Sequence, residues 1–82
     1  MKENNSEKIF KEAFAKVLGM PEQEVVDSLS PGNSSGWDSF NTIMLISELE
    51  KSFNVRFLPE NVADIHNVGD FKSFLRKKGV AL

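Results

Sequence analysis

Residues 36–53 of the chain read GWDSFNTIMLISELEKSF, a loop-like start followed by a dense apolar pattern. Seven apolar residues recur there at helical spacing: Phe40, Ile43, Met44, Leu45, Ile46, Leu49 and Phe53. The pattern predicts a helix over 39–53 with a broad apolar face. Asp38 is the expected N-cap, because its carboxylate can accept hydrogen bonds from unpaired N–H groups of the first turn. Since the face is wider than one core contact needs, we expect Met44 to stay exposed for docking.

A second amphipathic pattern precedes this helix. Apolar residues from Ser6 to Leu18 follow one helix face, and charged residues occupy the other. Gly19 is a suitable C-cap and Pro21 cannot continue the helix, so we expect it to end near Leu18. Residues 19–38 then form a long loop rich in Pro, Gly and Ser, and loops of this length usually have a function. Three apolar residues are expected to attach the loop to the core: Val25, Val26 and Leu29.

The C-terminal third of the chain predicts two more helices. Asn54 is expected to end the central helix, and Pro59 to open a short helix that runs through Ile65. Asn67 is expected to cap a last helix, with the Asp70 side chain reaching back to accept a backbone N–H as in a capping box. The core face of that helix contains Val68, Phe71, Phe74 and Leu75. The predicted fold is therefore all-α: a small bundle of three longer helices plus one short helix, with a long loop between the first and second helices.

Length and composition limit the chain to one domain without a thiol of its own. The 82 residues (9.2 kDa) suffice for one core, so we treat 1–82 as a single domain with a core of about 6–78. The absence of cysteine excludes disulfides, a cysteine nucleophile and thiolate metal sites. His66 is the single histidine, and the chain has no Gly-x-Ser-x-Gly elbow. We therefore expect no metal site and no catalytic residue of these kinds.

The charge distribution indicates which partners the chain prefers. The net charge is −2, but residues 19–70 carry −7, whereas residues 1–18 carry +1 and residues 71–82 carry +4. The acidic centre repels nucleic acid, and the central helix has Lys51 as its single basic residue, so we expect no nucleic-acid binding. Neither a secretory signal nor a membrane span is recognisable, which favours a cytoplasmic protein without membrane insertion. We expect a monomer.

Ser39 stands where a covalently attached phosphate group would be stabilised. It follows Asp38 at the start of the central helix, where the helix dipole and unpaired N–H groups favour an anion. The alternative interpretation is a serine that simply fills an ordinary helix start. A second Asp-Ser pair occurs at residues 27–28, but no amphipathic helix starts at Ser28. We therefore assign Ser28 a structural role and take Ser39 as the candidate site.

Three blocks of sequence together resemble the acyl carrier protein family. They read GWDSF at 36–40, LISELEKSFNV at 45–55 and NVGDF at 67–71. The family's corresponding pattern has a Gly-x-Asp-Ser-Leu site, a Leu-Glu-x-x-Phe helix end and a Thr-Val-x-Asp start to the last helix. The resemblance covers about residues 6–78. The spacing between the blocks makes the set more specific than an Asp-Ser pair alone.

The resemblance implies a carrier rather than a catalyst. It implies that a phosphopantetheinyl transferase attaches 4′-phosphopantetheine from coenzyme A to Ser39, beside the helix cap Asp38, which makes the chain a phosphoprotein. The thiol of this arm would hold an acyl group as a thioester for acyl-loading and acyl-using enzymes. Such carriers serve fatty acid or polyketide-type biosynthesis, where a tether raises the effective concentration of the substrate. A thiol supplied by the arm is consistent with a chain that has no cysteine.

Partner contacts are expected on the central helix beyond Ser39. The candidates are Phe40, Ile43, Met44, Glu48 and Glu50. The two acids, together with Asp38, either steer partner enzymes or form an ordinary solvated helix face, and the sequence does not choose between these interpretations. Phe40 replaces the family's usual Leu, and Lys51 and Met44 stand where carriers of fatty acid synthesis typically have acids. We take these departures as a sign of a specialised carrier.

Two other functions fit the same residues. An aminoacyl or peptidyl carrier of a nonribosomal pathway would use the same serine and the same arm. An unmodified helical adaptor would use Phe40, Met44 and their neighbours only to bind a protein partner. Attachment of a phosphopantetheine arm to Ser39 distinguishes the carriers from the adaptor.

Overall fold

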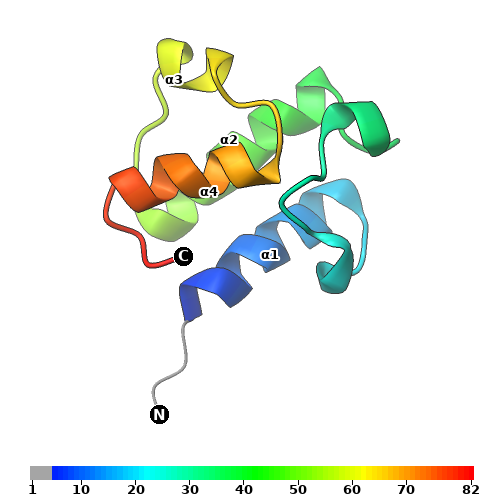
Figure 1. Cartoon of the computed structure of the whole chain (residues 1–82), viewed down its shortest axis with the longest axis horizontal. Coiled ribbons are helices and arrows are strands. Elements are labelled where there is room, and N and C mark those ends of the chain that lie inside the picture. The colour runs from blue at the N-terminus through cyan, green and yellow to red at the C-terminus, as the bar shows by residue number, and fades with distance from the viewer. Residues whose placement is uncertain (1–4) are drawn as a thin grey trace.

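Four α-helices form the fold in the computed structural model, which describes residues 5–82 (Figure 1). They are α1 (Asn5–Leu18), α2 (Ser39–Phe53), α3 (Pro59–Ala63) and α4 (Val68–Lys77). Two 3₁₀ turns, η1 (Glu22–Glu24) and η2 (Pro31–Asn33), lie in the long loop between α1 and α2. The described residues contain no strand, which confirms the prediction of an all-α fold with three longer helices and one short helix. In Figure 1, α4 lies between α1 and α3.

The helix ends follow local sequence signals. Gly19 leaves α1 with a φ of 67°, a left-handed conformation that glycine adopts without strain, and its N–H donates to the Ala15 carbonyl at 2.9 Å. Asn54 ends α2 in a similar conformation, with a φ of 55°. The short helix α3 was predicted to run through Ile65, but it ends at Ala63. The N–H groups of Asp64 and Ile65 bond to carbonyls three residues back instead of four, so the α-helical pattern stops there.

One aromatic cluster connects the helices. The Phe14 ring of α1 packs edge-on against Trp37 and Phe71, with ring centroids 5.6 and 5.5 Å apart. Phe57, in the segment after α2, packs against Phe71 at 5.8 Å and stacks on Phe74 at 4.3 Å. The buried apolar core consists of Phe10, Ala13, Phe14, Val25, Leu29, Trp37, Leu45, Leu49, Phe57, Val68, Phe71 and Leu75. Because this core draws on α1, α2, α4 and the loop, it fixes the start of α2 against the rest of the bundle.

The long loop is attached both to the core and to α4. Val25 and Leu29 are buried as predicted, but Val26 is 49% exposed, so its predicted core contact is wrong. The first two N–H groups of α4 donate to the carbonyls of Leu29 and Asp27 at 2.9 and 3.0 Å. The loop thereby satisfies backbone donors that a helix start leaves unpaired.

The start of α4 contains most of the predicted capping box. The Asn67 side-chain oxygen accepts a hydrogen bond from the Asp70 N–H at 2.8 Å, so Asn67 is the N-cap. The Asp70 carboxylate in turn accepts a hydrogen bond from the N–H of His66 at 2.8 Å, one residue before the position that a capping box uses. Together these bonds fix the turn between α3 and α4.

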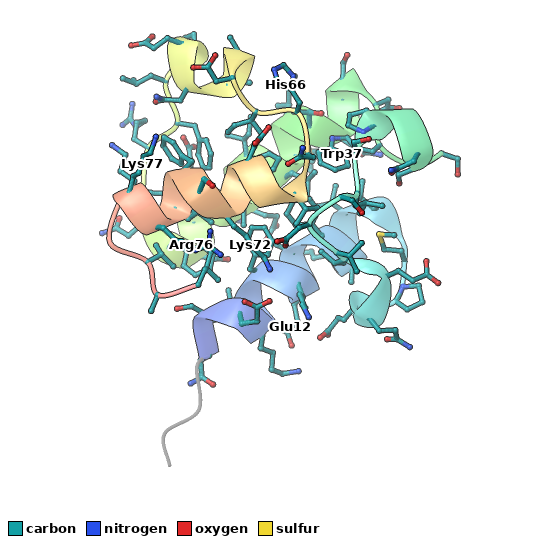
Figure 2. All side chains as sticks on the ribbon, in the orientation of Figure 1. Glu12, Trp37, His66, Lys72, Arg76 and Lys77 are labelled. Carbon is teal, nitrogen blue, oxygen red and sulfur yellow. The ribbon has the colours of Figure 1, made fainter. Side chains whose placement is uncertain are left out.

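A buried lysine links three segments of the fold. Lys72 of α4 is 9% exposed, and Figure 2 shows it pointing toward α1. Its Nζ lies 3.2 Å from the Glu7 carboxylate of α1, 3.1 Å from the Asp27 carboxylate of the loop and 5.7 Å from the centre of the Phe10 ring. Burial by itself lowers the pKa of Lys72, but hydrogen bonds from Lys72 to Asp27 and Glu7 and their negative charges outweigh it and raise the pKa above 10.5.

Candidate functional site

Hydrogen bonds to Asp38 fix the start of α2. Asp38 has an extended backbone (φ −121°, ψ −173°), and its Oδ1 accepts a hydrogen bond from the Asn41 N–H at 2.8 Å. Its carbonyl oxygen accepts the N–H of Thr42 at 2.9 Å, which begins the helical hydrogen-bond pattern. Asp38 is therefore the N-cap of α2, as its position in the sequence predicted.

Ser39 is the first residue of α2, and its side chain is exposed. The first N–H groups of a helix have no partner within the helix, and the helix dipole makes this end positive. A phosphodiester on the Ser39 hydroxyl would therefore place its negative charge at a favourable point of the fold. The arrangement combines an accessible hydroxyl with a helix end that would stabilise an attached phosphate.

Trp37, two residues before Ser39, is 4% exposed and belongs to the core. Its indole N–H donates to the Thr42 hydroxyl at 2.8 Å, so the polar group of this buried side chain is satisfied. Figure 2 shows Trp37 beside the first turn of α4. The core therefore holds the chain firmly just before the exposed serine.

An exposed apolar stripe begins directly after Ser39. Phe40, Ile43 and Met44 are 67%, 64% and 41% exposed, and their spacing places them on one face of α2. The prediction that Met44 stays exposed is confirmed, although Phe40 and Ile43 are more exposed still. An apolar stripe of this kind on a helix is typical of a docking surface.

The acids of α2 have contacts within the chain. The Glu48 side chain is 19% exposed and lies 3.1 Å from Lys16 of α1 and 4.0 Å from Lys51. The Glu50 carboxylate accepts a hydrogen bond from the Phe57 N–H at 2.8 Å, which attaches α2 to the segment that follows it. Both acids therefore help to hold α2 in place, and their contacts with partners stay a prediction. Asp38 is the exposed acid nearest to Ser39 in the sequence.

Two other residues considered from sequence do not belong to α2. Ser28 is exposed but lies in a turn of the long loop, where its carbonyl accepts a hydrogen bond from the Asn33 side chain at 3.1 Å. His66 is exposed and precedes α4. Sequence reasoning missed Thr42, whose hydroxyl accepts the Trp37 indole N–H and donates to the Asp38 carbonyl. Its position four residues after Asp38 was the available signal, because a threonine hydroxyl in a helix can bond to the carbonyl four residues back.

Comparison with known protein families now identifies the chain. Residues 8–75 match the family described as the phosphopantetheine attachment site. The chain belongs to this family. The match runs from α1 into α4 and contains the start of α2. It confirms the resemblance to acyl carrier proteins that the three sequence blocks indicated.

A phosphopantetheine-attachment domain has 4′-phosphopantetheine as a covalently bound cofactor. The start of α2 fits this group, because it offers an exposed hydroxyl for the phosphodiester and a helix N-terminus for its charge. A carrier of this family interacts with a phosphopantetheinyl transferase and with biosynthetic enzymes. None of the helices within residues 5–82 combines the length and the apolar character that crossing a membrane requires.

Proposed function

We propose that the chain is an acyl carrier protein and that Ser39 carries the 4′-phosphopantetheine arm. The main support is the position of Ser39: it is exposed, it begins α2 and it directly follows the N-cap Asp38. Ser28 is exposed as well, but it lies in a turn and not at the first residue of an α-helix. The dipole and unpaired N–H groups that favour a phosphodiester are therefore available to Ser39.

Attachment of the arm is a phosphoryl-group transfer to this hydroxyl. The Ser39 oxygen forms a bond to the pantetheine-bearing phosphorus of coenzyme A, the diphosphate bond breaks and adenosine 3′,5′-bisphosphate leaves. The transferase accepts the proton that the hydroxyl loses. Once attached, the arm supplies the thiol on which an acyl group is held as a thioester. The chain itself contributes the position of Ser39 and a surface for partners, and partner enzymes perform the catalysis.

The proposed partner surface is the side of α2 next to Ser39. Its centre is the exposed apolar stripe of Phe40, Ile43 and Met44. Glu48 and Glu50 extend the surface along the helix, but each also has a contact within the chain. We therefore assign most of the docking free energy to the apolar stripe and a steering role to the acids, including Asp38.

The first experiment measures the mass of the intact chain after incubation with coenzyme A and a promiscuous phosphopantetheinyl transferase. The wild-type chain and Ser28→Ala should each gain one phosphopantetheinyl group, and Ser39→Ala should gain none. Ser28→Ala is the matched control, since it removes the hydroxyl of the other Asp-Ser pair. Modification of Ser39→Ala would show that the arm is attached elsewhere. An unmodified wild-type chain, with a transferase shown to be active on another carrier, would favour the unmodified adaptor.

The nature of the cargo separates the two kinds of carrier. We propose an acyl carrier because the three sequence blocks follow the acyl carrier pattern. The modified chain should then accept an acyl group from an acyl-loading enzyme and should not be loaded by an adenylating enzyme that transfers amino acids. Preferential loading with an amino acid would instead identify an aminoacyl or peptidyl carrier.

A further inference from the structure

We infer that Trp37 and Thr42 are positioning residues for the modification of Ser39, an inference that rests on the proposed function. Neither residue is the one esterified. Both act through the backbone immediately before Ser39, and they connect this backbone to the core of the protein.

The connection is a short chain of hydrogen bonds. The Trp37 indole N–H donates to the Thr42 hydroxyl at 2.8 Å, and that hydroxyl donates to the Asp38 carbonyl at 2.9 Å. This carbonyl belongs to the peptide group that joins Asp38 to Ser39. It also accepts the backbone N–H of Thr42 at 2.9 Å. Two donors therefore hold the peptide plane from which Ser39 extends.

The far end of this chain is anchored in the core. The Trp37 ring is 4% exposed and packs against Phe14 of α1 and Phe71 of α4, with centroids 5.6 and 6.1 Å away. An indole N–H left without an acceptor in such a place is energetically costly, which favours keeping the bond to Thr42. The rigidity of the aromatic cluster is thus transmitted to the residue before Ser39.

Asn41 of α2 adds two more hydrogen bonds between the helix and the loop that precedes Ser39. The Asn41 side-chain N–H donates to the Gly36 carbonyl, and its backbone N–H donates to the Asp38 carboxylate at 2.8 Å. Residues on the helix side of Ser39 therefore bond to residues on the loop side, across the serine itself. Ser39 is exposed, but its backbone is held from both directions.

This rigidity matters for a group transfer. The serine oxygen has to meet the phosphorus in line with the leaving group, and a displacement of about 1 Å can cost up to ~10²-fold in rate. Docking depends on a different set of side chains, the exposed stripe of α2. Loss of the Trp37–Thr42 connection should therefore lower the turnover number of the transferase and leave its KM for the carrier nearly unchanged.

The test compares Thr42→Val with Thr42→Ser in the full chain, at saturating coenzyme A and varied carrier concentration. Valine keeps the shape of threonine but can neither accept from the indole nor donate to the carbonyl, whereas serine can do both. We expect Thr42→Val to lower kcat about tenfold, within the range that misplaced reactants cost, and Thr42→Ser to keep it. Adding Trp37→Phe to Thr42→Val should cause no further loss, because the first substitution has already broken the connection.

A second measurement observes the hydrogen bond directly. The chain has one tryptophan, so an NMR spectrum of the unmodified protein contains a single indole N–H signal. This signal should move in Thr42→Val and stay in place in Thr42→Ser, while chemical denaturation shows that both variants are folded under assay conditions.

The possible outcomes separate the inference from the function on which it rests. Equal kcat for the two Thr42 variants, or a change confined to KM, would overturn the inference while Ser39 remained the modified residue. A wild-type chain that an active transferase does not modify would overturn both.

Discussion

At the scale of single residues, Gly36 allows the loop to approach α1 closely. A Cβ atom at this position would lie 3.0 Å from the carbonyl oxygen of Leu18, closer than nine in ten real Cβ contacts. The neighbouring atom is backbone, so it cannot move aside as the end of a flexible side chain could. The approach brings the segment before Ser39 against the end of α1.

Gly36→Ala should therefore destabilise the protein, by about 1–3 kcal/mol as is usual for overpacking. Gly32→Ala is the matched control, because its added Cβ would meet the Ser30 hydroxyl at an ordinary distance of 3.6 Å. Urea denaturation of both variants measures the effect as a shift of the midpoint at constant slope. Equal midpoints for the two alanine variants would show that the loop relaxes without cost.

At the scale of the element, α2 has one face buried in the core and an exposed face that we propose for partners. Leu45 and Leu49 are fully buried, whereas Ile43 is 64% exposed and contributes little to folding. Burying an isoleucine side chain in an interface contributes roughly 1.5–3 kcal/mol. Ile43→Thr keeps the branched shape and should raise the transferase KM for the carrier about tenfold, since 1.4 kcal/mol corresponds to a factor of ten.

Val26→Thr is the control for this prediction. Val26 is also an exposed apolar residue, 49% exposed, but it lies in the long loop and not on α2. Its substitution should change neither KM nor the urea midpoint. If Ile43→Thr and Val26→Thr gave the same KM as the wild-type chain, α2 would not be the surface that the transferase recognises.

The sequence predicted the helices better than it predicted which side chains they expose. Both predicted ends of α2 agree with the structure, because the N-cap Asp38 and the left-handed Asn54 end the helix through bonds to residues nearby in the sequence. The exposure of Val26 and the greater exposure of Phe40 and Ile43 relative to Met44 were not predictable, since burial depends on which segments pack together. The same applies to the Trp37–Thr42 hydrogen bond, which needs the ring of Trp37 to be held by Phe14 and Phe71.

At the scale of the whole molecule, Lys72 joins parts of the chain that are far apart in sequence. It bonds to Glu7, 65 residues away, and it also pairs with Asp27 of the long loop. From sequence, Lys72 was simply one of the cations of the basic C-terminus. Its burial follows from the packing of α4 on α1, which places this position over the Phe10 ring.

Lys72→Met should destabilise the protein by about 1.5–3 kcal/mol, the usual contribution of hydrogen bonds to charged groups. The cost should be smaller than that of leaving a fully buried charge without a partner. The Asp27 side chain is 69% exposed to solvent, and Glu7 still has Lys11 at 3.7 Å as an ion-pair partner. Lys77→Met serves as the control, since Lys77 lies on the same helix and is exposed.

The pH dependence distinguishes the charge of Lys72 from its packing. Burial lowers the pKa of Lys72, but the hydrogen bonds to Asp27 and Glu7 and the charges of these two carboxylates together outweigh it, so the pKa is raised in the folded protein. The folded state therefore holds this proton more tightly than the unfolded state, so its contribution is complete below pH 10.5 and is lost as the pH rises through the folded pKa. The stability difference between wild type and Lys72→Met should be the same at pH 7 and pH 9 and should shrink at pH 11. A difference that persists unchanged at pH 11 would mean that the proton on Lys72 is not what stabilises the fold.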